Sequence, residues 1–172
     1  MSKGIEKLQE EYKEIKKSNK LTSIGGTANP KNWNLFFWEA CLKGPKNSPY
    51  ENGFFILQMK FNENYPYERP LVQMRTPIFH PNINNENGNI CVEYLNRWEK
   101  DYNIIGIMYA VFELLYFPNF ANAYSFYKCK DERTYFKIAS KYTFNYADET
   151  QMCLLHLWDK GWKFEGFVDD IQ

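Results

Sequence analysis

The sequence predicts an α+β fold in which an N-terminal helix precedes a meander of short strands and further helices follow. Three observations predict it. Apolar residues recur at helical spacing near the N-terminus, they alternate with polar residues between residues 35 and 75, and a long apolar stretch covers residues 103–116. Because a sheet with an apolar face has to be covered, we expect the helices to pack on it.

Three segments have the periodicity of helices. Residues 3–17 form an amphipathic helix whose apolar face carries Ile5, Leu8, Tyr12 and Ile15. Residues 103–116 are apolar on nearly every face, which is typical of a buried central helix, and Pro118 ends it. A further helix is predicted over residues 131–146. The lysines of the first helix, Lys7 among them, fit either a solvated face or a docking surface for a partner enzyme.

A four-stranded antiparallel meander is expected between these helices. Its strand candidates are residues 21–24, 35–43, 54–61 and 71–75. The second and third have the period of two that strands show, with one face apolar throughout, whereas residues 25–26 and 29–32, rich in Gly, Asn and Pro, are predicted to form a loop. Short connections between consecutive strands favour antiparallel pairing of neighbours.

The length of 172 residues fits one domain with a short extension. We expect a core domain over residues 1–147 and a C-terminal extension over residues 148–172. The extension contains the apolar run Met152–Trp158, and then a mixture of aromatic and acidic residues. A helix packed on the core is the favoured interpretation, and a segment that binds another molecule is the alternative.

Charge and cysteine usage argue against several classes of protein. Basic and acidic residues cancel at 21 each, so a nucleic-acid partner is not expected. No apolar run approaches the roughly 18 residues of a membrane span, so no membrane partner is expected either. The four cysteines form no C-x-x-C pair and there are two histidines, so we expect no metal, no cofactor and no disulfide framework. Reduced thiols predict a cytoplasmic or nuclear location, or both.

Candidate chemistry lies in the turn-rich segment of residues 77–93. Pro81 and Asn82 come near its start, Gly88 follows a run of Asn and Glu, and Cys91 stands between two apolar residues. A single cysteine is more often a small buried apolar residue than a nucleophile. In this loop, however, the thiol is predicted to be the nucleophile for which the rest of the chain is a platform.

These pieces, in this order, resemble the ubiquitin-conjugating enzyme family over residues 5 to about 147. The most specific part is His80-Pro81-Asn82-Ile83 followed by Gly88-Asn89-Ile90-Cys91. Other matching pieces are Lys7–Glu11, Leu35–Ala40 with Gly44-Pro45, Ser48–Gly53, Tyr65–Pro70, Trp98 and Pro118-Asn119. The loop from His80 to Cys91 is one residue longer than in the shortest members, which weakly resembles the H-type, histone-modifying members.

The resemblance implies the family's fold and activity. Cys91 would accept the C-terminal carboxyl of ubiquitin, or of a relative, from an activating enzyme as a thioester and pass it to a substrate lysine, usually with a ligase. By resemblance, Asn82 stabilises the oxyanion, His80 orders the loop, and Glu93 gates the incoming amine. The residues alone leave Asn82 open as a turn amide and Glu93 as a solvated carboxylate.

The resemblance also indicates partner-facing residues and departures. Tyr67 stands where an aromatic commonly anchors a ligase, and in the companion loop Trp98 is followed by Glu99, Lys100 and Asp101 where many members have Ser-Pro-Ala. Asn122 replaces a frequent acidic gate, and Ala123 and Tyr124 replace a proline and a leucine. The segment 122–130 is shorter than usual, so a family helix is expected to be stunted.

Three functions remain open from the sequence. The chain is an active conjugating enzyme for ubiquitin, a conjugating enzyme for a ubiquitin-like modifier, or a non-catalytic variant that binds partners as a scaffold. Cys91 argues against the scaffold, and the altered segment Asn122–Tyr124 is its support.

Overall fold

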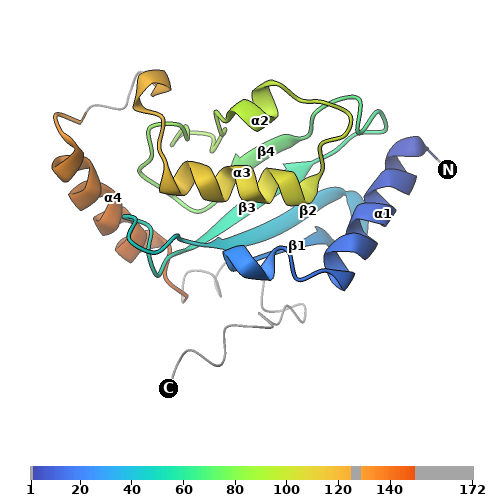
Figure 1. Ribbon diagram of the computed structural model, residues 1–172, viewed down its shortest axis with the longest axis horizontal. Helices are drawn as coiled ribbons and strands as arrows, with labels where there is room; N and C mark the ends of the chain where they lie inside the picture. The colour runs from blue at the N-terminus through green and yellow to red at the C-terminus, as the bar shows by residue number, and fades with distance from the viewer. Residues whose placement is uncertain (1, 125–128, 150–172) are drawn as a thin grey trace.

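The computed structural model describes residues 2–124 and 129–149 of the chain. Along these residues an N-terminal helix is followed by a sheet and then by further helices, as Figure 1 shows, so the predicted α+β class is confirmed. The helices are α1 (Lys3–Lys17), α2 (Glu93–Asn96), α3 (Ile104–Tyr116) and α4 (Glu132–Tyr146), with 3-10 turns η1 (Thr22–Ile24) and η2 (Phe120–Asn122). The strands are β1 (Gly26–Lys31), β2 (Asn34–Lys43), β3 (Phe54–Lys60) and β4 (Leu71–Met74).

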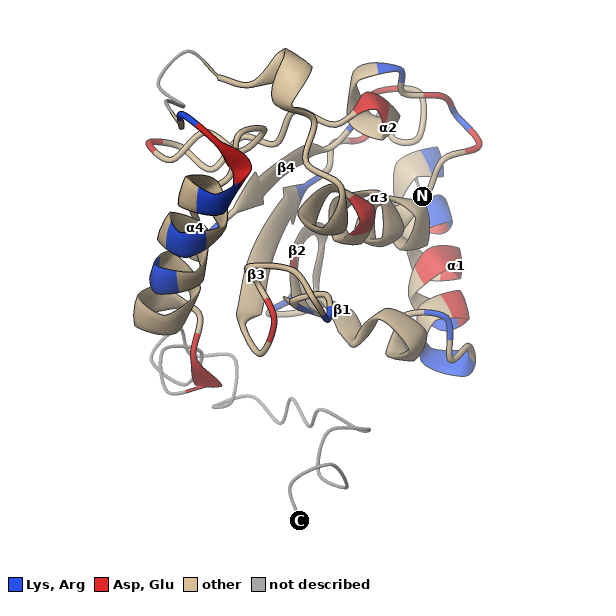
Figure 2. Ribbon diagram, turned by 60° about the vertical axis from the view of Figure 1, so that its left-hand side comes forward, with Lys and Arg blue, Asp and Glu red and all other residues tan. Residues whose placement is uncertain are grey.

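The first helix begins and ends where the sequence predicts. The Ser2 side chain accepts a hydrogen bond from the backbone N–H of Ile5, which caps the N-terminus of α1. Lys16 and Lys17 occupy the last turn, where cations favour the negative end of the helix dipole. Acidic and basic residues are interspersed on α1, as Figure 2 shows, so this helix presents no surface of a single sign.

The sheet is an antiparallel meander in the order β1-β2-β3-β4, as predicted. Ala40 of β2 faces Leu57 of β3, and Leu57 in turn faces Met74 of β4. These side chains are buried, because β2 and β3 direct their alternate apolar residues to the face that the helices cover.

The predicted first strand is misplaced. Residues 21–24 contain the 3-10 turn η1, which ends at Gly25 with φ 60°, and β1 occupies Gly26–Lys31 where a loop was expected. β1 is an edge strand, so the missing N–H of Pro30 does not interrupt the hydrogen bonding of a central strand. Ala28 is its one buried residue, so the strand carries no apolar alternation that the sequence could reveal.

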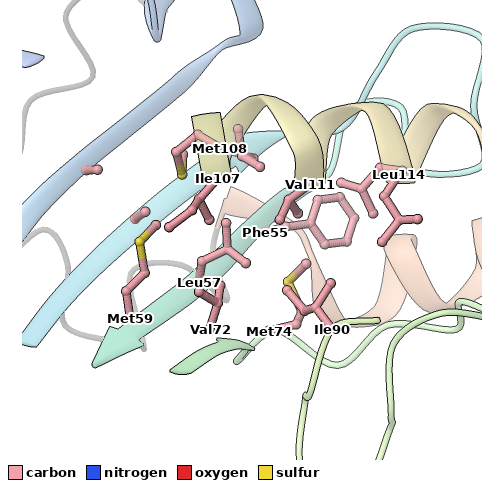
Figure 3. Packing of buried hydrophobic residues seen from close by; sticks show 14 of the residues in the cluster. Phe55, Leu57, Met59, Val72, Met74, Ile90, Ile107, Met108, Val111 and Leu114 are labelled. Carbon is pink, nitrogen blue, oxygen red and sulfur yellow. The ribbon is translucent and has the colours of Figure 1, made fainter. Parts of the chain in front are cut away.

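The core lies between α3 and the sheet. Figure 3 shows Ile107, Val111 and Leu114 of α3 against Phe55 and Leu57 of β3. The Asn103 side chain caps α3 by accepting from the N–H of Gly106, and seven of the helix's residues are buried, which confirms the predicted buried helix. In Figure 1, α1 and α4 lie at opposite ends of the molecule.

Two short elements were not predicted. α2 comprises four residues directly after Val92, a length at which apolar periodicity cannot be read. η2 ends at Asn122, where the segment with the expected stunted helix begins; residues 125–128 of that segment lie outside the described residues. α4 begins one residue after the predicted start, because Asp131 is its N-cap and accepts from the N–H of Thr134.

The core continues as far as Ala147, whose carbonyl accepts from the N–H of Phe54 at 2.7 Å. Residues 150–172, and so most of the predicted extension, lie outside the described residues, and the boundary at residue 147 stays a prediction. Among the described helices, none combines the length and apolarity needed to cross a bilayer.

Candidate active site

The loop from His80 to Cys91 folds back on itself as a narrow hairpin. Ile83 and Ile90 form an antiparallel bridge, and the N–H of Cys91 donates to the carbonyl of Asn82 at 2.8 Å. Gly88 has φ 75° and its carbonyl accepts from the N–H of Met74. A Cβ at residue 88 would overlap the carbonyl oxygen of Met74, so this close approach to β4 requires glycine. The hairpin brings Asn82 and Cys91 together.

His80 is a structural residue of this hairpin. Its ring is 1% exposed, with Nε2 at 2.9 Å from the carbonyl of Leu114 and Nδ1 accepting from the N–H of Asn82 at 3.0 Å. This pairing requires the neutral tautomer with its proton on Nε2. Burial lowers the pKa of His80 to about 4, so the ring is neutral at physiological pH and ties the loop to α3.

Asn82 is fully buried and binds the loop to the segment before η2. Its Oδ1 accepts from the N–H of Asn119 at 2.8 Å, and its Nδ2 donates to the carbonyls of Asn119 at 2.7 Å and Asn122 at 3.2 Å. The amide thus pairs with the backbone of Asn119 much as a second peptide unit would. Both of its donor hydrogens are directed to carbonyls in this state.

Cys91 is half-buried at the end of the hairpin, directly before α2. Its Sγ accepts from Nδ2 of Asn96, the last residue of α2, at 3.6 Å. Tyr124 closes another side: its N–H donates to the Pro81 carbonyl at 2.9 Å, and its hydroxyl donates to the Asn89 carbonyl at 3.4 Å. Burial, and then the nearby Cys91, raise the pKa of Tyr124.

The two candidate gates are both exposed. Glu93 opens α2 and pairs with Arg97 one turn later, with 3.1 Å between Oε1 and Nε. Both side chains are more than two-thirds exposed, so this pair adds little stability. Asn122 lies in η2, and its backbone carbonyl, rather than its amide, contacts Asn82.

The residues predicted to face a ligase are carried by neighbouring loops. Tyr67 is 67% exposed, and Trp98 donates from Nε1 to the carbonyl of Pro66 at 2.7 Å. Glu99, Lys100 and Asp101 are exposed beside them. An aromatic stack of Tyr94 on Tyr102, with ring centroids 4.0 Å apart, supports the second loop. Lys7 lies on α1, 3.9 Å from Glu11.

Sequence reasoning missed two residues of the site. The backbone of Asn119 is the hydrogen-bond partner of the Asn82 side chain. In the sequence, the Pro118-Asn119 pair served only as part of the family resemblance, and no role was predicted for Asn119. Asn96 is the last residue of α2, and its side chain contacts Cys91. No spacing rule points to a residue five positions after a cysteine, and α2 is too short to be predicted. The described cysteine Cys41 is fully buried, and burial raises the pKa of its thiol, so it cannot take the place of Cys91.

The described residues hold no group of three or more His, Cys, Asp or Glu side chains arranged to bind a metal ion. A half-buried thiol on a hairpin beside an antiparallel meander suits the class of cysteine-based group carriers, whose chemistry needs only a thiolate and nearby donors.

Comparison with known proteins places the chain within that class. The family model "Ubiquitin-conjugating enzyme" matches residues 7–143. The chain is 38% identical over 120 residues to the probable ubiquitin-conjugating enzyme E2 L460 of Acanthamoeba polyphaga mimivirus, covering 69% of this chain and 75% of that protein. It is 36% identical over 118 residues to the probable ubiquitin-conjugating enzyme E2 31 of Arabidopsis thaliana, covering 68% and 73%.

The fold agrees with these sequence relatives. A crystal structure of a Plasmodium yoelii protein assigned to the ubiquitin conjugating enzymes superposes with a TM-score of 0.76 at 31% identity, covering 86% of this chain and 97% of that one. The chain therefore belongs to the ubiquitin-conjugating enzyme family. Membership implies, in general terms, ubiquitin, an activating enzyme and a ligase as partners.

Proposed function

We propose that the chain accepts ubiquitin from an activating enzyme as a thioester on Cys91 and transfers it to a substrate lysine, usually with a ligase. The single observation that carries the proposal is the half-buried Cys91 held by the hairpin between β4 and α2. Family membership supplies the reaction class, and a location in the cytoplasm, the nucleus or both belongs to the same proposal.

Loading is a thioester exchange. The Cys91 thiol loses its proton and the thiolate attacks the carbonyl carbon of the thioester on the activating enzyme. The new carbon–sulfur bond forms as the old one breaks, and the activating enzyme's sulfur leaves as a thiolate that takes up a proton. Thiolates are good nucleophiles and good leaving groups, so this step needs no basic residue beside Cys91.

Discharge to lysine is the harder step. A free lysine amine is neutral in only about one molecule in 2,500 at pH 7. The amine attacks the thioester carbonyl, its proton is lost to an acceptor or to water, an isopeptide bond forms, and the Cys91 thiolate leaves. Glu93 and Asn122 flank the approach as proposed gates. For Asn82 to stabilise the oxyanion, one of its donors would have to leave the Asn119 or Asn122 carbonyl.

A ubiquitin-like modifier is the second candidate. The exposed Glu99, Lys100 and Asp101 beside Tyr67 differ from the sequence that the commonest ligases meet, and this observation favours it. The H-type, histone-modifying subclass rests only on the longer His80–Cys91 loop and stays a prediction.

A panel of purified modifiers, each with its activating enzyme and ATP, tests the proposal. Ubiquitin should give a thiol-sensitive band on a non-reducing gel. A band with another modifier alone would select the second candidate.

The exposed Asn122 gives a prediction about amine selectivity. Asn122→Asp places a carboxylate on η2 near the approach to Cys91, where it can accept the amine's proton. We expect discharge of the thioester to free lysine to accelerate by about tenfold, less than the roughly hundredfold or more that a fully positioned general base supplies. Single-turnover chase measurements on pre-charged protein check this. Asn85→Asp, which adds the same charge to an exposed position of the hairpin, is the matched control. Equal discharge rates for the two variants would reject the gate.

A further inference from the structure

Among the described residues, the side-chain amide that donates a hydrogen bond to the sulfur of Cys91 belongs to Asn96. Its Nδ2 donates to Sγ of Cys91 at 3.6 Å. Asn82, which the resemblance assigns to the oxyanion and not to the sulfur, directs both of its donors to backbone carbonyls at 2.7 and 3.2 Å. The hydrogen-bond donor at the sulfur therefore comes from α2 and not from the loop.

The position of Asn96 is fixed by the anchoring of α2. Leu95 is 3% exposed in the core, and its carbonyl accepts from Nη1 of Arg69 at 3.3 Å. The Tyr94 hydroxyl accepts from the N–H of Asn103 at 3.2 Å and packs so closely on Gly106 that a Cβ there would overlap it. The N–H of Asn96 itself closes the helix on the carbonyl of Val92 at 3.0 Å. These contacts hold the backbone of α2 on both sides and place residue 96 within hydrogen-bond reach of the sulfur.

We propose that Asn96 is a catalytic residue of the conjugation reaction, in which its amide donates to the negatively charged sulfur of Cys91. A thiolate has no proton to give, so the amide must present Nδ2 to it. A hydrogen bond to the charged form favours that form, so the donor increases the share of nucleophile before loading. It acts again on discharge, because a stabilised thiolate is a better leaving group when the carbon–sulfur bond breaks.

The role in conjugation rests on the proposed function, but the effect on the sulfur can be measured without any modifier. The experiment compares iodoacetamide alkylation rates of the wild-type chain, Asn96→Ala and Asn96→Asp, followed by mass spectrometry of the peptide that contains Cys91. Asn145→Ala, which removes an exposed asparagine amide from α4, is the matched control. Thermal unfolding of all four proteins shows whether the fold is intact.

Near neutral pH we expect alkylation to slow by about threefold in Asn96→Ala, which loses one hydrogen bond to a charged group at an exposed site. In Asn96→Asp it slows by about tenfold, because a carboxylate replaces the donor beside the thiolate. The control stays at the wild-type rate. At about pH 10.5, where ordinary thiols are ionised, the rates of wild type and Asn96→Ala converge.

Two results would overturn the inference. One is an alkylation rate in both Asn96 variants equal to that of wild type near neutral pH. The other is a deficit in Asn96→Ala that persists unchanged at high pH, which would mean that the substitution only moves or covers the thiol. If the alkylation results hold and no modifier charges the protein, the proposed function fails while the donor role at the sulfur stands.

Discussion

At the scale of the residue, the site separates groups that hold the loop from groups that can react. His80 and Asn82 are buried and direct their polar atoms to backbone partners. Cys91, Glu93 and Asn96 stand on the solvent side. A half-buried thiol on buried polar supports is held in one place without being enclosed, which suits the proposed role of Cys91 as a carrier that meets several large partners in turn.

The buried neutral His80 gives a pH prediction. Its pKa is about 4 in the fold against 6.5 ordinarily, so the unfolded chain binds the proton first as pH falls. The contribution of neutral His80 to the unfolding free energy is fully present above pH 6.5. It is lost as pH falls toward 4, and at pH 4 the loss amounts to about 3 kcal/mol.

Urea unfolding at several pH values checks the prediction. Wild type should lose about 3 kcal/mol of unfolding free energy relative to His80→Gln between pH 6.5 and 4, since the glutamine does not titrate. Because the variant keeps every other ionisable group, the difference between the two curves isolates His80. Parallel curves would mean that the ring is not held neutral by the fold.

The sequence anticipated individual residues unevenly. Cys91, His80 and Asn82 stand in a dense, ordered pattern, and the structure brings all three together. The roles of Glu93, Asn122 and Asn82 stay predictions, because exposed side chains are not fixed by packing and the Asn82 donors are occupied. Asn96 could not be found, since its contact depends on the three-dimensional path of the chain after Cys91.

At the scale of the element, the hairpin of residues 80–91 is joined to the segment of residues 118–124 rather than to the sheet alone. The Asn82 side chain makes one half of this junction and the Tyr124 N–H, donating to the Pro81 carbonyl, makes the other. Tyr124, one of the residues that the resemblance marks as a departure, therefore lies where the hairpin and this segment meet, close to Cys91.

The Asn82 junction can be tested by its effect on stability. Asn82→Ala removes the three hydrogen bonds that the buried Asn82 side chain makes with the backbone of Asn119 and Asn122, so we expect a loss of about 3 kcal/mol in unfolding free energy, about 1 kcal/mol for each bond. Asn84→Ala is the matched control in the same hairpin, because Asn84 Oδ1 accepts only from nearby backbone N–H groups.

Chemical denaturation of the uncharged protein measures both variants. The control should lose about 1 kcal/mol or less, as expected for a local turn bond. If Asn82→Ala is as stable as wild type, Asn82 has no structural role in the resting protein and its importance would lie in the transition state alone.

Elements were predictable where packing imposes a period. Helices 3–17, 103–116 and 131–146 and the strands over β2, β3 and β4 were predicted nearly to the residue, because each buries a regular face. β1 and α2 were not. β1 is an edge strand with one buried residue, and α2 has four residues. Both form because of contacts with neighbouring elements, and a local sequence pattern does not show such contacts.

At the scale of the whole molecule, one buried carboxylate links the surfaces that partners would use. Glu11 of α1 is 4% exposed and accepts from the Tyr65 hydroxyl at 2.7 Å and from the N–H of Ile104 at 2.8 Å. Burial raises its pKa. Glu11 thereby connects α1 with the base of the loop that carries Tyr67 and with the first turn of α3.

The central claim is that Cys91, and no other thiol of the chain, carries the modifier. The measurement is a non-reducing gel after incubation with activating enzyme, ATP and ubiquitin, run for wild type, Cys91→Ser and Cys129→Ser. Wild type and Cys129→Ser should give a band that thiol removes, and Cys91→Ser an oxyester band that thiol leaves intact. A thiol-sensitive band that persists in Cys91→Ser, or no band in wild type with any modifier, would contradict the account.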